Sequence, residues 1–305
     1  MKQVHAQNRL IALLLAVTML LSAAACGGRE TSPDASSSTP QDTSSTGVPA
    51  FVNPLPDADL SAVAEPKKPE GDLLEKLNTA YNQNNDVVGW LSVPDTTMDD
   101  PVMFCENDAN TQNDPDPENR NFYQRRDINK QYDWYGSYWV DYECKLGNRN
   151  ELSRNTIIYG HSMDDDPEGL KMSQLKKYND IEWAKQHPYI YFSTAEDEMV
   201  WKVFAVSTVD TNLAYNHPDL SDADFMNLIS ELKDRSAYDI DVDVKSTDKI
   251  LLISTCTYPT NYTNVQLDES TKYLIVARLL RPGEEETATV EMTVNEDVKK
   301  PQYNF

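Results

Sequence analysis

Short apolar runs that end in small or polar residues recur along the chain. Two of them, residues 155–160 and 249–256, are rich in β-branched residues, as is typical of buried strands. Further strands are expected at residues 87–94, 101–104, 136–142, 189–193, 199–209 and 272–280. Because these strands do not alternate regularly with helices, the pattern predicts a mostly β protein. A β-barrel or mixed sheet decorated with helices is expected, rather than a doubly wound fold.

Helical spacing of apolar residues marks three other segments. An N-terminal helix is expected to begin near Asp72, with that residue as its cap. A long inserted helix is expected near residues 168–186. A third helix is expected at residues 221–235, with a serine cap, acidic residues in the first turn and basic residues in the last. Residues 284–305 are polar and form either a tail or, from the alternation in 287–294, an edge strand.

The chain begins with a segment typical of protein export. Lys2 and Arg9 supply a basic start, residues 10–21 are almost wholly apolar, and small residues precede Cys26. The apolar stretch is shorter than the ~20 residues that span a bilayer, so residues 1–25 are predicted to be a signal peptide. The arrangement around Cys26 resembles a bacterial lipoprotein signal, in which the cysteine is lipidated. Ordinary secretory cleavage before a cysteine is the alternative.

The next segment and the overall charge limit the range of partners. Residues 26–71 are rich in Ser, Thr and Pro and too poor in apolar residues to fold, so a disordered tether is predicted. A catalytic domain is then expected over residues 72–283. With 27 basic and 50 acidic residues, the net charge of −23 argues against binding to nucleic acid. The acidic residues form a solvated surface or, alternatively, attract a cationic partner such as an amine.

The two clearest strands each end in a residue that can do chemistry. Cys256 ends one run and His161 follows the other. A thiol and an imidazole at two strand ends are the minimal parts of a cysteine nucleophile and its proton partner. Taken singly, such a cysteine is more often an inert core thiol, and such a histidine a turn residue.

The remaining cysteines and histidines give no metal site. An exported location permits a disulfide between Cys105 and Cys144, although the sequence favours two separate thiols. The four histidines lie far apart and none is paired with a cysteine at zinc-ligand spacing, so no metal is predicted.

These runs resemble motifs of the sortase family, and of class B in particular. Residues 155–161 resemble its histidine motif, and residues 254–256 resemble its cysteine motif. The helical insertion at 168–186 also suits class B. The resemblance covers residues 72–281 in the family's order. Its remaining matches, to the opening of the class B domain, are residues 86–91, 101–102, 136–137 and 141–142.

The resemblance implies an eight-stranded β-barrel and a cell-surface cysteine transpeptidase. In that family the cysteine, here Cys256, attacks the carbonyl after a threonine in a C-terminal sorting signal, and the histidine, here His161, transfers protons. The acyl-enzyme then passes the surface protein to an amine of a peptidoglycan precursor or cross-bridge. Neither a metal nor an organic cofactor is implied. A lipid on Cys26 would hold the enzyme at the extracellular face of the bacterial cytoplasmic membrane.

Two positions depart from the family pattern. Leu252 stands four residues before the cysteine, where the family has threonine. Lys272 aligns with the arginine that family members need at the start of the following strand. Arg278 is the fallback, on the same face of that strand but six residues, or ~20 Å, further along. A lysine keeps the charge but lacks the planar fork that binds two oxygens at once.

Two other functions stay open on the sequence. A sortase-fold binding or assembly module with little turnover would account for the missing arginine, although the intact Cys256 and His161 oppose it. A cysteine peptidase that only hydrolyses would use the same pair. Use of an acceptor amine therefore separates these functions.

Overall fold

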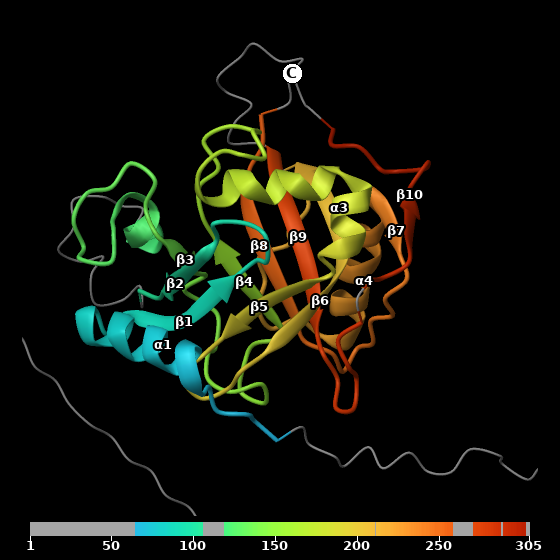
Figure 1. The fold of residues 1–305 in the computed structure, drawn as a ribbon. Coiled ribbons are helices and arrows are strands. Elements are labelled where there is room, and N and C mark those ends of the chain that lie inside the picture. The colour runs from blue at the N-terminus through green and yellow to red at the C-terminus, as the bar shows by residue number, and fades with distance from the viewer. Residues whose placement is uncertain (1–64, 106–118, 211, 259–270, 288, 303–305) are drawn as a thin grey trace, which may run out of the picture. The chain divides into compact units, whose positions relative to one another are not determined.

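Eight strands close into a barrel, in the order β1-β2-β3-β4-β8-β9-β6-β5. The eight-stranded barrel expected from the sequence is thereby confirmed. Figure 1 shows β8 and β9 side by side in the barrel wall. The computed structural model describes residues 65–105, 119–210, 212–258, 271–287 and 289–302. The strands of the barrel are β1 Val87–Ser92, β2 Asp99–Met103, β3 Tyr138–Val140, β4 Asn155–Tyr159, β5 Tyr189–Ser193, β6 Val200–Asp210, β8 Ile250–Cys256 and β9 Thr271–Leu279.

Burial on both faces explains the continuous apolar runs of β4 and β8. The two strands are parallel neighbours, with Asn155 opposite Ile250 and Tyr159 opposite Ser254. A parallel pair that is covered on both faces gives unbroken apolar runs rather than alternation. Every side chain of residues 250–253 is fully buried. These two strands therefore lie in the hydrophobic core, and only their carboxyl ends reach the rim of the barrel.

Two of the three expected helices form close to their predicted positions. Helix α1 spans Gly71–Gln83, so Asp72 lies in its first turn. The N-cap is Glu70, whose side chain makes no capping bond, and the expectation that Asp72 caps this helix was wrong. Helix α4 spans Asp222–Asp234, and the Ser221 side chain accepts a hydrogen bond from the Asp224 amide, as the capping pattern predicts.

The helical insertion differs from the single long helix that was expected near 168–186. It consists of a 3-10 helix, η2, at Lys171–Asn179, and a short α-helix, α3, at Ile181–Gln186. Asp180 separates them with an extended backbone, and its carboxylate caps α3 by accepting from two amides. Six of the nine residues of η2 are buried, so this segment packs on more than one face. Figure 1 shows the insertion lying across β8 and β9.

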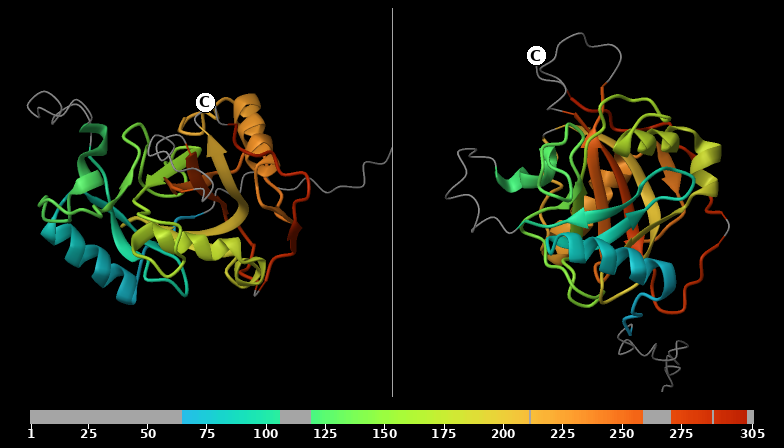
Figure 2. Two further views of the ribbon diagram at one scale, coloured as in Figure 1. Left: turned by 90° about the horizontal axis from the view of Figure 1, so that it is seen from above. Right: turned by 60° about the vertical axis from the view of Figure 1, so that its left-hand side comes forward.

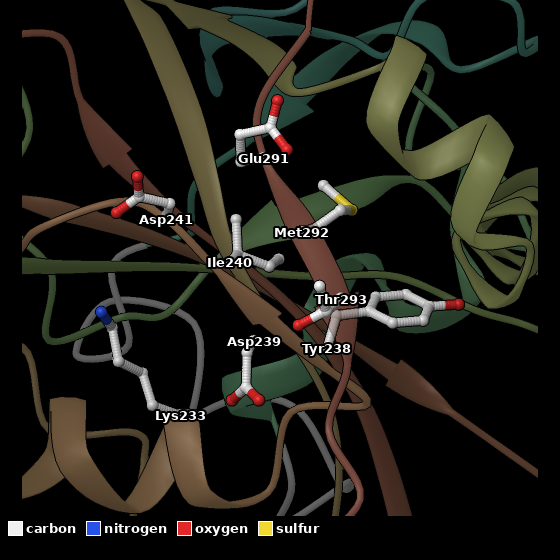
Figure 3. A pocket seen from close by; sticks show the side chains of 8 residues that line it. All are labelled: Lys233, Tyr238, Asp239, Ile240, Asp241, Glu291, Met292 and Thr293. Atoms are coloured by element: carbon white, nitrogen blue, oxygen red, sulfur yellow. The ribbon is translucent and has the colours of Figure 1, made fainter.

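The polar C-terminal residues contribute a short strand outside the barrel. Strand β10, Met292–Val294, pairs antiparallel with β7, Tyr238–Ile240. Figure 3 shows a pocket of about 400 Å³ at this small sheet. It contains no cysteine or histidine and is lined by Lys233, Tyr238, Asp239, Ile240, Asp241, Glu291, Met292 and Thr293.

The helices in the described part of the chain are short or amphipathic. None of those in the described residues has both the length and the apolar character needed to cross a bilayer. The predicted signal peptide, the tether up to residue 64 and Cys26 lie outside the described residues.

Leu252 provides a test of the core beneath the strand ends. It is fully buried between Ile157 of β4 and Val276 of β9. Leu252→Thr would place a hydroxyl there without a partner, whereas Leu252→Val changes only volume. Since an unsatisfied buried hydroxyl costs ~1–3 kcal/mol, the threonine variant should have the lower free energy of unfolding by about that amount. Urea titration of both variants measures the difference, and equal stabilities would contradict an apolar environment at this position.

Candidate active site

The parallel register of β4 and β8 brings His161 and Cys256 to the same rim of the barrel. Tyr159 lies opposite Ser254, and each candidate residue follows two positions later on its own strand or just beyond it. Neighbouring strands are ~4.8 Å apart, so the two residues emerge side by side. They line one pocket of about 200 Å³. Its lining residues are Gln124, Trp139, Tyr159, Gly160, His161, Tyr215, Ser254, Thr255, Cys256 and Lys272.

Lys272 stands directly beside the cysteine. The two residues are paired across β8 and β9, and the Lys272 Nζ lies 3.4 Å from the Cys256 Sγ. The thiol is partly exposed, so a substrate can reach it. An ammonium group at this position can interact with negative charge that develops on the sulfur or on a substrate oxygen beside it.

Arg278, the fallback cation, lies at the other end of the same strand pair. It is opposite Ile250, is 1% exposed and does not line the pocket. Its guanidinium forms two hydrogen bonds to the Glu284 carboxylate, at 2.6 and 2.8 Å. Of the two candidate cations, Lys272 is thus the one beside the thiol, and Arg278 holds the turn that follows β9.

His161 is buried and held by a backbone carbonyl. Its side chain is 8% exposed, and the Nε2 atom lies 2.9 Å from the Gln124 carbonyl oxygen. Because a carbonyl can only accept, the Nε2 atom carries the hydrogen and the Nδ1 atom keeps its lone pair. Burial, together with the positive charges of Arg125 and Lys272, lowers the pKa of His161 from 6.5 to about 4. The resting imidazole is therefore neutral at pH 7.

The segment that carries the Gln124 carbonyl is the 3-10 helix η1, Asn119–Arg125. Figures 1 and 2 show this segment beside β3, on the side of the barrel where β3 and β4 lie. Trp139 of β3 contacts the histidine ring at a centroid distance of 6.3 Å. The imidazole is thus positioned between β3 and η1, two elements that precede its own strand in the sequence.

Close packing explains the glycine that precedes the histidine. A Cβ atom on Gly160 would lie 2.7 Å from both the Met172 Cε and the Tyr138 Cδ1. The Gly160 carbonyl also accepts a 2.7 Å hydrogen bond from the Thr255 hydroxyl. The residue before the histidine is therefore tied to the residue before the cysteine, which fixes the two strand ends relative to each other.

Sequence reasoning did not identify every residue that touches this site. The Tyr215 hydroxyl is hydrogen-bonded to the Ser254 hydroxyl at 2.9 Å. The Lys176 Nζ donates to the Cys256 carbonyl at 3.0 Å. Neither residue lies in a motif, and Lys176 belongs to a segment whose pattern predicted only an amphipathic helix. The sequence carries no signal that points to these contacts.

The other cysteines of the described residues lie elsewhere. No disulfide joins Cys105 to Cys144. Burial raises the pKa of Cys144 to about 12, so its thiol is unreactive. Within the described ranges, no group of three His, Cys, Asp or Glu side chains could hold a metal ion.

The lowered pKa of His161 makes the free energy of unfolding depend on pH. A histidine whose pKa falls from 6.5 to about 4 on folding stabilises the protein above pH 6.5, and this contribution is lost as the pH falls toward 4. The full contribution is about 3 kcal/mol. His161→Gln should lack that part of the pH dependence. NMR titration of the ring protons should give a midpoint near pH 4, and a midpoint near 6.5 would contradict the buried position.

Comparison with known proteins finds relatives by sequence and by fold, although no protein-family model matches the chain. Sortase B of Listeria monocytogenes is 28% identical over 194 residues, which is 63% of this chain and 71% of the relative.

Two solved structures share the fold. One is a Staphylococcus aureus sortase B-substrate complex, with 23% identity, a TM-score of 0.55 and coverage of 69% of this chain and 87% of the other. The second is a sortase B complexed with triglycine, with 23% identity, a TM-score of 0.54 and coverage of 68% and 86%. By sequence, barrel topology and fold, the chain is a class B sortase-like protein, a cysteine transpeptidase.

Proposed function

We propose that Cys256 is the nucleophile of this transpeptidase, His161 its proton donor and acceptor, and Lys272 the cation that stabilises the reacting carbonyl oxygen. One observation carries the proposal: an ammonium group 3.4 Å from a partly exposed thiol, in a pocket that a buried imidazole also lines. Each group has the chemistry that its role requires. A thiolate attacks, an imidazole moves protons, and a fixed positive charge stabilises a negative oxygen.

The first half of the reaction forms an acyl-enzyme. The neutral His161 accepts the proton of the Cys256 thiol as the sulfur adds to the carbonyl carbon after a threonine in a sorting signal. The carbonyl oxygen becomes negative beside the Lys272 ammonium. The C–N bond then breaks, and the protonated His161 donates its proton to the leaving amine. Because burial lowers the pKa of His161, its protonated form is a strong acid and transfers this proton readily.

The second half transfers the acyl group to an amine of a peptidoglycan precursor or cross-bridge. The amine nitrogen attacks the thioester, the neutral His161 accepts its proton, and the C–S bond breaks to regenerate the thiolate. The two related structures, one with a substrate and one with triglycine, support a peptide donor and an amine acceptor for this chain. The net charge of −23 also favours the approach of a cationic amine.

Peptide transfer provides the test of function. The full chain is incubated with a library of threonine-containing peptides, with and without triglycine, and the products are identified by mass spectrometry. Cleavage after threonine with transfer to the amine is expected. Cys256→Ala should abolish both cleavage and the covalent adduct, whereas Cys105→Ala removes a thiol that does not line the pocket and should keep both.

The two alternatives give different outcomes in the same experiment. Cleavage that is independent of the amine would identify a hydrolysing peptidase. Peptide binding without cleavage or adduct would identify a binding or assembly module. Equal turnover by Cys256→Ala would exclude a thiol mechanism altogether.

Lys272 gives a second prediction. Removing one group that stabilises an oxyanion costs ~10²–10³-fold in kcat, so Lys272→Ala should slow acylation by about that factor. Lys272→Arg keeps the charge and restores the two-oxygen geometry, so it should match or exceed the natural enzyme. Lys185→Ala removes a partly exposed lysine of α3 that pairs with Glu182 and does not line the pocket, and it serves as the control. A harmless Lys272→Ala would remove this residue from the mechanism.

We further propose that a lipid on Cys26 anchors the enzyme at the extracellular face of the cytoplasmic membrane. The basic start, the apolar run and the small residues before Cys26 support this proposal, as does the polar segment that follows. Such a tether would let the barrel reach both a membrane-bound precursor and the cell wall.

The anchor is tested in a Gram-positive host. Metabolic labelling with a fatty acid should mark the natural protein, and Cys26→Ser should abolish the label and release the protein from membranes. A natural protein that is unlabelled and already soluble would contradict the anchor.

A further inference from the structure

An ion pair between a buried lysine and a partly exposed aspartate lies beneath the cysteine. Lys176 of η2 has a side chain that is 1% exposed, and its Nζ lies 3.1 Å from the Asp165 Oδ1. The same ammonium donates a 3.0 Å hydrogen bond to the main-chain carbonyl of Cys256. The charge of Lys176 is thus committed to one carboxylate and to the backbone of the candidate nucleophile.

The carboxylate of this pair holds the next two residues. The Asp165 Oδ2 accepts a 2.7 Å hydrogen bond from the Tyr258 amide and a 3.0 Å hydrogen bond from the Thr257 hydroxyl. The Tyr258 hydroxyl in turn donates to the Ser162 carbonyl at 2.8 Å. Lys176 and Asp165 therefore fix three consecutive residues, 256–258, and connect them to the segment that directly follows His161.

Stability alone does not account for this arrangement. Taking the Lys176 ammonium out of water is costly, and replacing a buried ion pair by apolar residues often leaves a protein equally or more stable. Burial lowers the pKa of Lys176, which reflects this cost. The Tyr273 ring, 4.4 Å from the ammonium, offsets only part of it through a cation–π contact. The two charges are better explained by their hydrogen bonds to residues 256–258, which they hold in place.

We propose that Lys176 and Asp165 are positioning residues for the nucleophile. They fix the backbone at the end of β8 so that the Cys256 Sγ stays against the Lys272 ammonium. This role rests on the proposed function of Cys256. It requires no contact between Lys176 and the substrate.

Alkylation of Cys256 measures this positioning without any sorting peptide. The full-length protein is treated with iodoacetamide across a pH series, and modification of Cys256 is followed by peptide mapping. Lys176→Met and Asp165→Asn should each slow the alkylation of Cys256, because the thiol is no longer held in one position. In peptide transfer kcat should fall by ~10–100-fold, since small misplacements of reacting groups cost up to that factor, with KM changed less than about two-fold.

Lys177→Met is the matched control. Lys177 is the next residue of η2 and forms an ion pair with Glu168, and among the described residues it makes no hydrogen bond to residues 256–258. The rate of Cys256 alkylation and the kcat of the Lys177→Met variant should equal those of the natural protein. A loss equal to that of Lys176→Met would show a general effect of the insertion and would overturn the proposal.

The double variant Lys176→Met/Asp165→Asn separates positioning from stability. Removing both charges relieves the cost of leaving one of them unpaired, so the melting temperature should recover toward that of the natural protein. Alkylation and kcat should remain low, because the hydrogen bonds from Lys176 are still absent. If reactivity returns together with stability, the pair is merely structural and the proposal fails. A chain that transfers no peptide but shows this alkylation pattern would contradict the proposed function and leave the positioning intact.

Discussion

The parallel pairing of β4 with β8 is the constraint on which the site depends. It sets Tyr159 opposite Ser254, and two residues later it leaves a histidine and a cysteine on the same rim. A shift of one residue in either strand would turn the side chains of that strand to the other face of the sheet and separate the histidine from the cysteine. The close packing of the buried side chains on both faces opposes such a shift. The hydrophobic core thus specifies the geometry of the reacting groups.

Positively charged side chains surround the thiol and the buried imidazole of the site. Lys272 lies against the thiol, Lys176 lies beneath its backbone, and Arg125 lowers the pKa of His161 together with Lys272. Together with burial, the charges of Arg125 and Lys272 disfavour a positive ring at rest. The protein as a whole is strongly acidic, so this local positive field is built by specific side chains against the overall charge.

The helical insertion covers the strands that carry these residues. Its 3-10 helix is buried on more than one face, and it supplies Met172 against Gly160 and Lys176 against Cys256. The insertion therefore packs beneath the site and supports it. This position also explains why it is not one regular helix. Asp180 caps a new helix at the point where the chain must turn along the barrel.

The sequence by itself determined the eight strands of the barrel and the helix at 221–235, because burial leaves a periodic record in the order of residues. The assignment of Cys256 and His161 to one site came from the resemblance of their motifs to a known family. It also put Lys272 ahead of Arg278, since strand spacing limits what one position can reach. Only the tertiary structure decided the break in the insertion, the cap of α1 and the contacts of Lys176. The Lys176 ammonium meets the Cys256 carbonyl across 80 positions of the chain. Periodicity shows that a residue is buried but not which distant residue it meets, because that depends on the path of the whole barrel.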